Sequence, residues 1–365
     1  MSAGSLSGAV MVPFFAAMLC VAPAVTRPTV PFGVRVPGER AGATVIRRER
    51  RAYFWRTAAI GAGCTVAAVL LQGHGSWWLT RVILLLEVAA DLGCFWIARK
   101  KITAVKSAEN WFAGHRQTVV TDTSWRTDPP RFPVRWLMPA LTVIAATVII
   151  GAVRYPDLPA RLAGGFGGPG HLVAKSVVSA FAVVAGQVYA TALWTGLMLI
   201  VYRSRPDIEA ADAAASTRRY RRFLAAMTRA VLTLLALVDL SLLLAALQKW
   251  RVYQLSGLGS ALPLLPFAVG LLVLAVVTVR AGQGGYRLSG GGGDRLAAGT
   301  DRDDDRFWKA GLIYVNRDDP AIMVGARFGV GWTFNLGNPM ARVIIAGMVA
   351  APAGLVLIWL AAGLG

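Results

Sequence analysis

Long apolar runs separated by polar segments dominate this sequence. Eight of the runs approach the roughly 20 residues that an α-helix needs to cross the hydrocarbon core of a bilayer. They lie near residues 4–25, 56–73, 77–98, 136–154, 174–202, 223–248, 262–280 and 341–363. The pattern predicts an all-α polytopic membrane protein with about eight transmembrane helices. A shorter alternating segment predicts a small cytoplasmic α/β module before the last helix.

Composition agrees with this interpretation. Hydrophobic residues make up 56% of the 365 residues, and the mean hydropathy is +0.54. Only 16% of the residues are charged, against roughly 25% in ordinary soluble domains. The net charge of +19 comes from arginines clustered between the apolar runs. Membrane placement explains this charge, so we expect no nucleic-acid partner.

The same basic residues predict an orientation. Four connections between apolar runs hold 29 Lys and Arg residues, whereas the alternate connections hold four. The basic connections are 26–56, 99–135, 203–222 and 281–340. Because positively charged loops remain in the cytoplasm, we expect these four inside and both termini outside. Their basic side chains are expected to contact the anionic lipids of the inner leaflet.

Several polar side chains fall inside the apolar runs, where ionisable groups are costly and usually face the bundle interior. The candidates are Glu87, Asp91, Gln187, Arg229 and Asp239. Glu87 and Asp91 are four residues apart and share one helix face. Depth along the helices predicts an ion pair between Asp91 and Arg229, and places Glu87, Gln187 and Asp239 near the midplane. Glu87 and Asp239 are either protonated, hydrogen-bonded packing groups or a proton- or cation-responsive site.

Residues that could hold a metal or take part in catalysis are scattered. The cysteines lie in apolar runs without a CxxC pair, and the histidines lie far apart in connections. These residues are Cys20, Cys64, Cys94, His74, His115 and His171. No phosphate loop, nucleophile elbow or dinucleotide fingerprint occurs. We therefore expect no metal, no cofactor and no enzymatic activity.

Residues 301–340, called here the C-terminal module, read as a small folded unit. The acidic run DRDDD lacks the glycine and glutamate of a calcium loop, so it is expected to cap a short helix in RFWKAG. Val330, Trp332, Phe334 and Leu336 alternate with smaller or polar residues, which predicts a small sheet or hairpin. The module either orders the last helix as a rigid connector or binds a lipid headgroup or a protein or peptide partner. The candidates for such a surface are Trp308, Lys309, Tyr314, Asn316, Asp319, Arg327, Trp332 and Asn335.

These features divide the chain into six consecutive parts. The order is a three-helix membrane region, a two-span domain, a pair of helices, a Gly-rich linker, the C-terminal module and the last helix. The corresponding ranges are 1–135, 136–202, 203–280, 281–300, 301–340 and 341–363.

The two-span part contains a recognisable motif. YPDLP supplies Tyr155, Pro156, Leu158 and Pro159, and Lys175 begins the next apolar run. This arrangement resembles a domain of unknown function found in bacterial multi-spanning proteins, including immunity proteins against a spore-killing peptide toxin. The family pattern also has a His-aromatic pair. RLAGGFGGPG stands in its place here, so no role is carried over to His171.

The C-terminal module resembles a second domain of unknown function that closes the same kind of protein. DDDRFWKAGLIYVNRDDP followed by RFGVGWTFNLGNP fits its signature at many fixed positions. Together the two resemblances imply an uncharacterised bacterial protein of the cytoplasmic (inner) membrane. The implied role is a non-enzymatic envelope sensor or a toxin-immunity or signalling protein. A proton- or cation-coupled transporter working through Glu87, Gln187 and Asp239 is the alternative.

Overall fold

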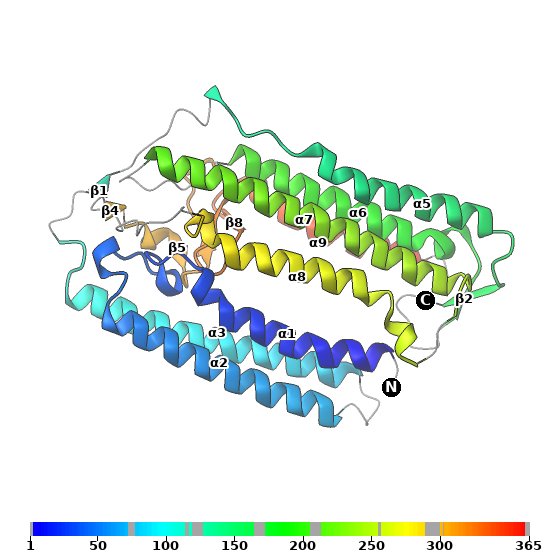
Figure 1. The fold of residues 1–365 in the computed structure, drawn as a ribbon, viewed down its shortest axis with the longest axis horizontal. Coiled ribbons are helices and arrows are strands. Elements are labelled where there is room, and N and C mark those ends of the chain that lie inside the picture. Colours follow the sequence, from blue (N-terminus) through cyan, green and yellow to red (C-terminus); the bar gives the residue numbers. More distant parts are fainter. Residues whose placement is uncertain are drawn as a thin grey trace. The chain divides into compact units, whose positions relative to one another are not determined.

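The structure is a computed structural model that describes most of the chain. The described residues are 3–71, 77–113, 117–118, 127–163, 172–204, 213–254, 257–288, 300–301 and 303–361. Their long helices are α1 (Ala3–Val25), α2 (Thr44–Leu71), α3 (Trp77–Ala108), α5 (Met138–Arg154), α6 (Val177–Arg203), α7 (Ala213–Lys249), α8 (Leu264–Ala281) and α9 (Pro339–Ala361) (Figure 1). They lie over the apolar runs, which confirms the predicted all-α class.

Within the described residues, five helical stretches are long and apolar enough to cross a membrane. They are Thr44–Leu71, Val134–Arg154, Val177–Arg203, Ala214–Lys249 and Leu264–Gly285. Large apolar side chains such as Leu70, Ile149 and Leu272 are exposed on these helices. Such faces are stable only against lipid or another apolar surface. The protein is therefore a membrane protein with transmembrane helices that contact the bilayer.

The predicted number of eight spans stays a prediction. α3 carries Arg81, Glu87 and Asp91 along its apolar part, which is more charge than an ordinary span contains. In α1 and α9, the stretches Met11–Val25 and Pro339–Gly354 are apolar.

The chain forms two compact units, and each consists of three separate segments. Unit 1 contains Met1–Pro130, Ser204–Leu224 and Thr278–Pro339, whereas unit 2 contains Arg131–Arg203, Ala225–Val277 and Met340–Gly365. The six parts predicted from the sequence follow chain order. The units instead combine segments that are distant in sequence, so the C-terminal module belongs with the N-terminal helices.

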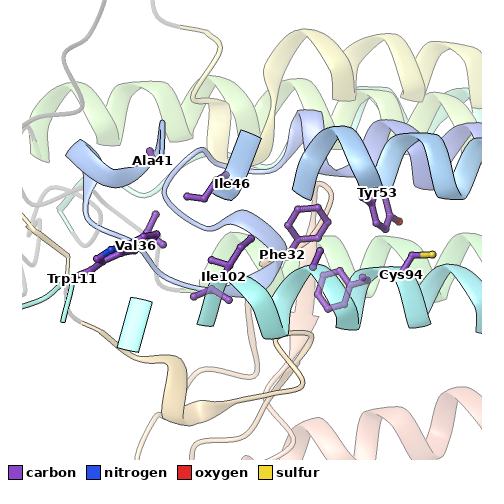
Figure 2. Close-up of a cluster of buried hydrophobic side chains, with 11 residues drawn as sticks. Phe32, Val36, Ala41, Ile46, Tyr53, Cys94, Ile102 and Trp111 are labelled. Atoms are coloured by element: carbon purple, nitrogen blue, oxygen red, sulfur yellow. The ribbon is translucent and has the colours of Figure 1, made fainter. Parts of the chain in front are cut away.

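In unit 1, α1, α2 and α3 lie side by side (Figure 1). The chain between α1 and α2 folds back over one end of these helices as two single turns, η1 (Pro31–Gly33) and η2 (Gly38–Arg40). A buried core forms there between the start of α2 and the second half of α3 (Figure 2). It contains Phe32, Val34, Val36, Ala41, Ile46, Tyr53, Cys94, Phe95, Ala98, Ile102 and Trp111.

The C-terminal module is built from two short antiparallel hairpins. β5 (Trp308–Lys309) pairs with β6 (Ile313–Tyr314), and β7 (Met323–Gly325) pairs with β8 (Trp332–Phe334). A parallel bridge between Tyr314 and Asn335 joins the hairpins. The module is thus a small β structure packed in unit 1.

The short helix expected in RFWKAG is absent from residues 303–338, all of which are described. One 3-10 turn, η7 (Asp305–Phe307), leads directly into β5. Ala310 and Gly311 then take φ values of 52° and 76° and reverse the chain. Asp304 precedes the turn without a side-chain capping bond. A helix is excluded because Trp308 pairs with Tyr314 across the hairpin, which buries both rings.

Unit 2 contains α5, α6, most of α7 and α8, and α9 from Met340. A hairpin of β2 (Arg161–Ala163) and β3 (Leu172–Ala174) connects α5 to α6. A second core, formed by Leu158, Leu162, Val173, Ala180, Ala246 and Trp250, lies at this hairpin. The hydroxyl of Tyr189 donates to the carbonyl oxygen of Met348 at 2.9 Å and joins α6 to α9.

The remaining pair of strands is β1 (Gln117–Thr118) with β4 (Thr300–Asp301), in parallel. The Gly-rich segment 289–299 lies outside the described residues, as do the three histidines. Residues 281–288 were assigned to the linker from the sequence. They instead contain the 3-10 turn η6 (Gln283–Gly285), which is buried.

Candidate functional site

Two carboxylates of α3, called here the acidic pair, lie buried inside unit 1. Glu87 is 0% exposed and Asp91 is 2% exposed. Thr57 of α2 lies beside Asp91. A Cβ atom added at Gly61 would lie 3.4 Å from an Oε atom of Glu87. Thr57 and Gly61 are one helical turn apart, so one face of α2 covers the acidic pair.

Apart from the hydroxyl of Thr57 beside Asp91, no described hydrogen-bonding group partners the four carboxylate oxygens. The other titratable side chains that interact with the acidic pair come from all three helices: Cys20, Tyr53, Cys64 and Cys94. Ionised carboxylates buried without a partner cost several kcal/mol. The burial fits both alternatives, protonated packing groups or a proton- or cation-responsive site.

The acidic pair has no third metal-ligating side chain grouped with it among the described residues. Across the described part of the chain, no three His, Cys, Asp or Glu side chains are grouped so that they could hold a metal ion. The predicted ion pair of Asp91 with Arg229 would join unit 1 to unit 2, and it stays a prediction. Within unit 2, the guanidinium of Arg229 lies 6.0 Å from the ring centroid of Trp136.

Unit 2 contains a second cluster of buried polar side chains, centred on Gln187 and Asp239. The amide nitrogen of Gln187 donates to the hydroxyl of Thr147 at 3.1 Å and to the backbone carbonyl of Asp239 at 2.9 Å. The hydroxyl of Thr191 donates to the carboxylate of Asp239 at 2.9 Å. These bonds connect α5, α6 and α7. One oxygen of Asp239 and the amide oxygen of Gln187 have no partner among the described residues.

A cluster of opposite charges attaches the C-terminal module to the rest of unit 1. Arg327 is 4% exposed and forms ion pairs with Asp304 and Asp305. Its guanidinium also donates to the carbonyl oxygen of Gly33 at 3.0 Å. The ammonium of Lys106 on α3 lies 2.7 Å from the carboxylate of Asp305. The acidic run therefore binds basic residues that are distant in sequence.

The electrostatics of Asp305 follow from this cluster. Burial by itself raises the pKa of Asp305, but the nearby charges of Arg327 and Lys106 oppose it. The backbone N–H of Arg35 adds a hydrogen bond of 3.0 Å. The net result holds the pKa of Asp305 below its usual range.

An aromatic side chain of the module enters the core of unit 1. The ring centroid of Phe328 lies 4.7 Å from that of Phe95 on α3. Phe32 and Tyr53 complete the surroundings, with centroids 6.3 and 6.2 Å from Phe328. Phe32 and Tyr53 are labelled in Figure 2. The module is thus in direct contact with α3 close to the acidic pair.

Two residues outside the module, Gln283 and Tyr220, form hydrogen bonds with its second hairpin. The side chain of Gln283 accepts from the N–H of Gly331 at 2.7 Å and donates to the carbonyl of Ala326 at 2.9 Å. The indole N–H of Trp332 donates to the hydroxyl of Tyr220 at 3.0 Å. Sequence reasoning missed Gln283, because it lies in a segment that reads as the beginning of a Gly-rich linker.

Half of the eight candidates for a docking surface are buried: Trp308, Tyr314, Arg327 and Asn335. The amide of Asn335 donates to the backbone carbonyls of Asn316, Asp319 and Ala321. These side chains are therefore not available to a lipid or a partner. They read as surface groups in the sequence because their partners come from separate turns and strands.

The other four candidates differ among themselves. Lys309 is exposed, whereas Asn316, Asp319 and Trp332 are partly buried. The hydroxyl of Tyr314 donates to the carboxylate of Asp319 at 2.9 Å, and the amide of Asn316 donates to that hydroxyl at 3.2 Å. The exposed positions of the module include Lys309, Ile313, Arg317, Asp318 and Leu336.

The residues of the YPDLP motif come together at one end of unit 2. The ammonium of Lys175 donates to the carbonyl oxygens of Pro156 and Leu158, at 3.0 and 3.2 Å. The same ammonium lies 5.0 Å from the ring centroid of Tyr155. Leu158 is buried in the second core. The motif thus defines a fixed turn, with the lysine as its hydrogen-bond donor.

Residues 317–342 match a family of unknown function (DUF5808). The match covers the second half of the C-terminal module and the beginning of α9. No curated protein and no solved structure matches the chain. The chain is therefore a membrane protein with a segment that is similar to a family of unknown function. The YPDLP-type domain stays a prediction.

Proposed function

We propose that this chain is a non-enzymatic signalling protein of the bacterial inner membrane, either an envelope sensor or a protein of the toxin-immunity type. One observation carries the proposal. Asp91 of the acidic pair is one helical turn from Phe95, and Phe95 contacts Phe328 of the C-terminal module. One turn is about 5.4 Å along the helix axis. A change of charge at Asp91 therefore acts on the same helix that holds the module.

The second half of α3 supports this coupling. Lys106, further along the helix, pairs with Asp303 and Asp305 of the module. Loss of a proton or cation from the acidic pair favours movement of α3 toward solvent or a counter-charge, since buried unpartnered charge is costly. Such a movement would alter at once the contact of Phe328 with Phe95 and the ion pairs of Lys106 with the module.

The charge asymmetry of the connections supports placement of the module in the cytoplasm and of both termini outside. In that orientation, the exposed side of the module faces the cytoplasm and is accessible to a protein or peptide partner. The basic connections then lie at the anionic inner leaflet, where each basic side chain contributes about 1 kcal/mol.

Hydrogen exchange of the full-length protein in lipid nanodiscs tests the proposal. Amide exchange itself accelerates with pH, so the measured quantity is protection, the intrinsic exchange rate divided by the measured rate at the same pH. We expect protection within residues 303–338 to vary between about pH 5 and pH 8, where a buried carboxylate can titrate. The double variant Glu87→Gln/Asp91→Asn should abolish this variation, because neither amide titrates. Glu109→Gln is the matched control, since Glu109 is a half-exposed carboxylate after the membrane part of α3. An unchanged pH response in the double variant would contradict the proposal.

A proton- or cation-coupled transporter is the second candidate. It is favoured by the half-unpartnered carboxylate of Asp239, which is bonded to Thr191 between α6 and α7. Ion flux into vesicles that contain the purified protein would distinguish the two functions. A transporter predicts flux that Asp239→Asn or Glu87→Gln abolishes. A signalling protein predicts no flux above that of empty vesicles.

A further inference from the structure

A polar cavity lies in unit 2 at the end of α5, and none of its lining residues belongs to the acidic pair or the C-terminal module. Its volume is about 210 Å³, and it is lined by Arg154, Asp157, Pro159, Trp250 and Arg251. Arg154 is the last residue of α5. Asp157 and Pro159 belong to the YPDLP motif, and Arg251 follows α7. The cavity therefore joins two segments almost one hundred residues apart.

The floor of the cavity is rigid. Trp250 is 4% exposed, and its indole N–H donates to the carbonyl of Ala180 at 3.3 Å. Its ring packs so closely on α5 that a Cβ atom at Gly151 would lie 2.8 Å from it. Lys175 holds the motif by two hydrogen bonds to its backbone. Because Lys175 is engaged in this way, the charge of the cavity comes from the lining residues.

Three charged side chains surround this floor without neutralising one another. No ion pair or side-chain hydrogen bond of Arg154, Asp157 or Arg251 occurs with any described residue. All three are exposed. Two guanidinium groups and one carboxylate thus line the cavity with their hydrogen-bonding capacity available to a ligand.

Arg251 also has an unfavourable backbone conformation. Its φ is 56°, in the left-handed region, where a residue other than glycine costs roughly 1–2 kcal/mol. Glycine is the usual residue at this position after a helix. Arg251 therefore keeps a conformation at the rim of the cavity that glycine would adopt without this cost.

The location of the cavity identifies the class of ligand. The candidate spans Val134–Arg154 and Ala214–Lys249 end beside it, and the ends of transmembrane helices lie at the level of the lipid headgroups. Guanidinium groups bind phosphate by paired, charge-assisted hydrogen bonds. A carboxylate binds an ammonium group. The cavity therefore offers partners for both charges of a zwitterionic headgroup.

We propose that this cavity binds the phosphoethanolamine headgroup of a membrane lipid. Arg154 and Arg251 hold the phosphate, and Asp157 accepts hydrogen bonds from the ammonium. Phosphatidylglycerol presents the phosphate without the ammonium, so it makes only part of these contacts. Phosphatidylcholine has a quaternary ammonium without N–H donors, so it also lacks the hydrogen bonds to Asp157. The inference is independent of the proposed signalling function.

Native mass spectrometry of the full-length protein tests the proposal, with titration of phosphatidylethanolamine, phosphatidylglycerol or phosphatidylcholine. We expect phosphatidylethanolamine to be retained at least tenfold better than the other two. Arg154→Gln/Arg251→Gln should reduce its retention at least tenfold. Asp157→Asn should remove the preference over phosphatidylglycerol. Arg161→Gln is the control, because Arg161 is an exposed arginine at the same end of unit 2 that does not line the cavity.

Equal retention of all three lipids by the unaltered protein would overturn the proposal, as would equal losses in the control variant. Arg251→Gly keeps the proposal testable if the double variant fails to fold. Glycine relieves the left-handed conformation, so the melting temperature without lipid should rise while retention of phosphatidylethanolamine falls. If the melting temperature and the retention of phosphatidylethanolamine both rise, Arg251 has no role in binding.

Displacement of the lipid by free phosphoethanolamine supports headgroup recognition. Displacement by a peptide carboxylate alone contradicts it.

Discussion

The guanidinium of Arg327 lies 3.0 Å from the carbonyl oxygen of Gly33, although 294 positions separate the two residues in the chain. This bond joins the C-terminal module to the segment between α1 and α2. Replacing Arg327 by methionine leaves Asp304 and Asp305 without their main partner. Loss of one member of a buried ion pair costs about 3–5 kcal/mol.

We therefore expect Arg327→Met to release the module, as a large increase of proteolysis and hydrogen exchange within residues 303–338. Arg317→Met is the matched control, because Arg317 is an exposed arginine of the same module. Equal protection of the module in both variants would show that the cluster does not hold it.

A second prediction concerns the pH dependence of the module. The pKa of Asp305 is held below its usual range by Arg327 and Lys106. A carboxylate with a lowered folded-state pKa stabilises the fold above its unfolded-state pKa, about 3.9, and loses this contribution as the pH falls through the folded-state value.

The difference in unfolding free energy between the unaltered protein and Asp305→Asn should therefore be constant from neutral pH down to about pH 5 and shrink below about pH 4. Denaturant unfolding of the two proteins across this range measures it. A difference that stays constant to below about pH 3, or grows as the pH falls, would mean that the pKa of Asp305 is not lowered.

The acidic run also shows what the sequence could and could not predict. DRDDD reads as a helix cap because capping depends on neighbouring residues. Its partners are Arg327, Lys106 and Arg35, which lie 22, 199 and 270 positions from Asp305. No local pattern contains such pairs. The long helices, in contrast, follow from apolar runs of bilayer length, and the structure places them where the runs lie.

The candidate sites divide in the same way. The spacing of Glu87 and Asp91 predicts that they share a face of one helix, and the structure places both in the interior of unit 1. Trp308 and Tyr314 are candidates for a docking surface by their sequence, yet strand pairing buries them. Composition indicates which side chains favour an interface, whereas burial depends on which strands pair.

The third prediction concerns Tyr314, whose hydroxyl donates to Asp319. Burial is the main cause that raises the pKa of Tyr314 to about 12. A group with a raised folded-state pKa stabilises the fold fully below its unfolded-state value, here about 10, and this stability is lost as the pH rises through about 12. The difference in ultraviolet absorbance between the unaltered protein and Tyr314→Phe should therefore show tyrosinate forming near pH 12. A transition near pH 10 would instead indicate that this hydroxyl is in contact with solvent.

The final prediction uses two glycines of α2 to test the packing around the acidic pair. A Cβ atom at Gly61 would collide with Ala16 of α1 and touch Glu87, whereas a Cβ atom at Gly63 would meet nothing within 4 Å. Overpacking of a helix contact costs about 1–3 kcal/mol, while glycine in a helix interior is less stable than alanine by about 0.5–1 kcal/mol. Gly61→Ala should therefore lower the melting temperature, and Gly63→Ala should raise it slightly.

The two variants add the same methyl group to the same helix. Melting-temperature changes of opposite sign would therefore report only the packing of α1 and α3 around Gly61. Equal effects of the two variants would mean that α1 does not lie against Gly61 and that the acidic pair is not enclosed in this way.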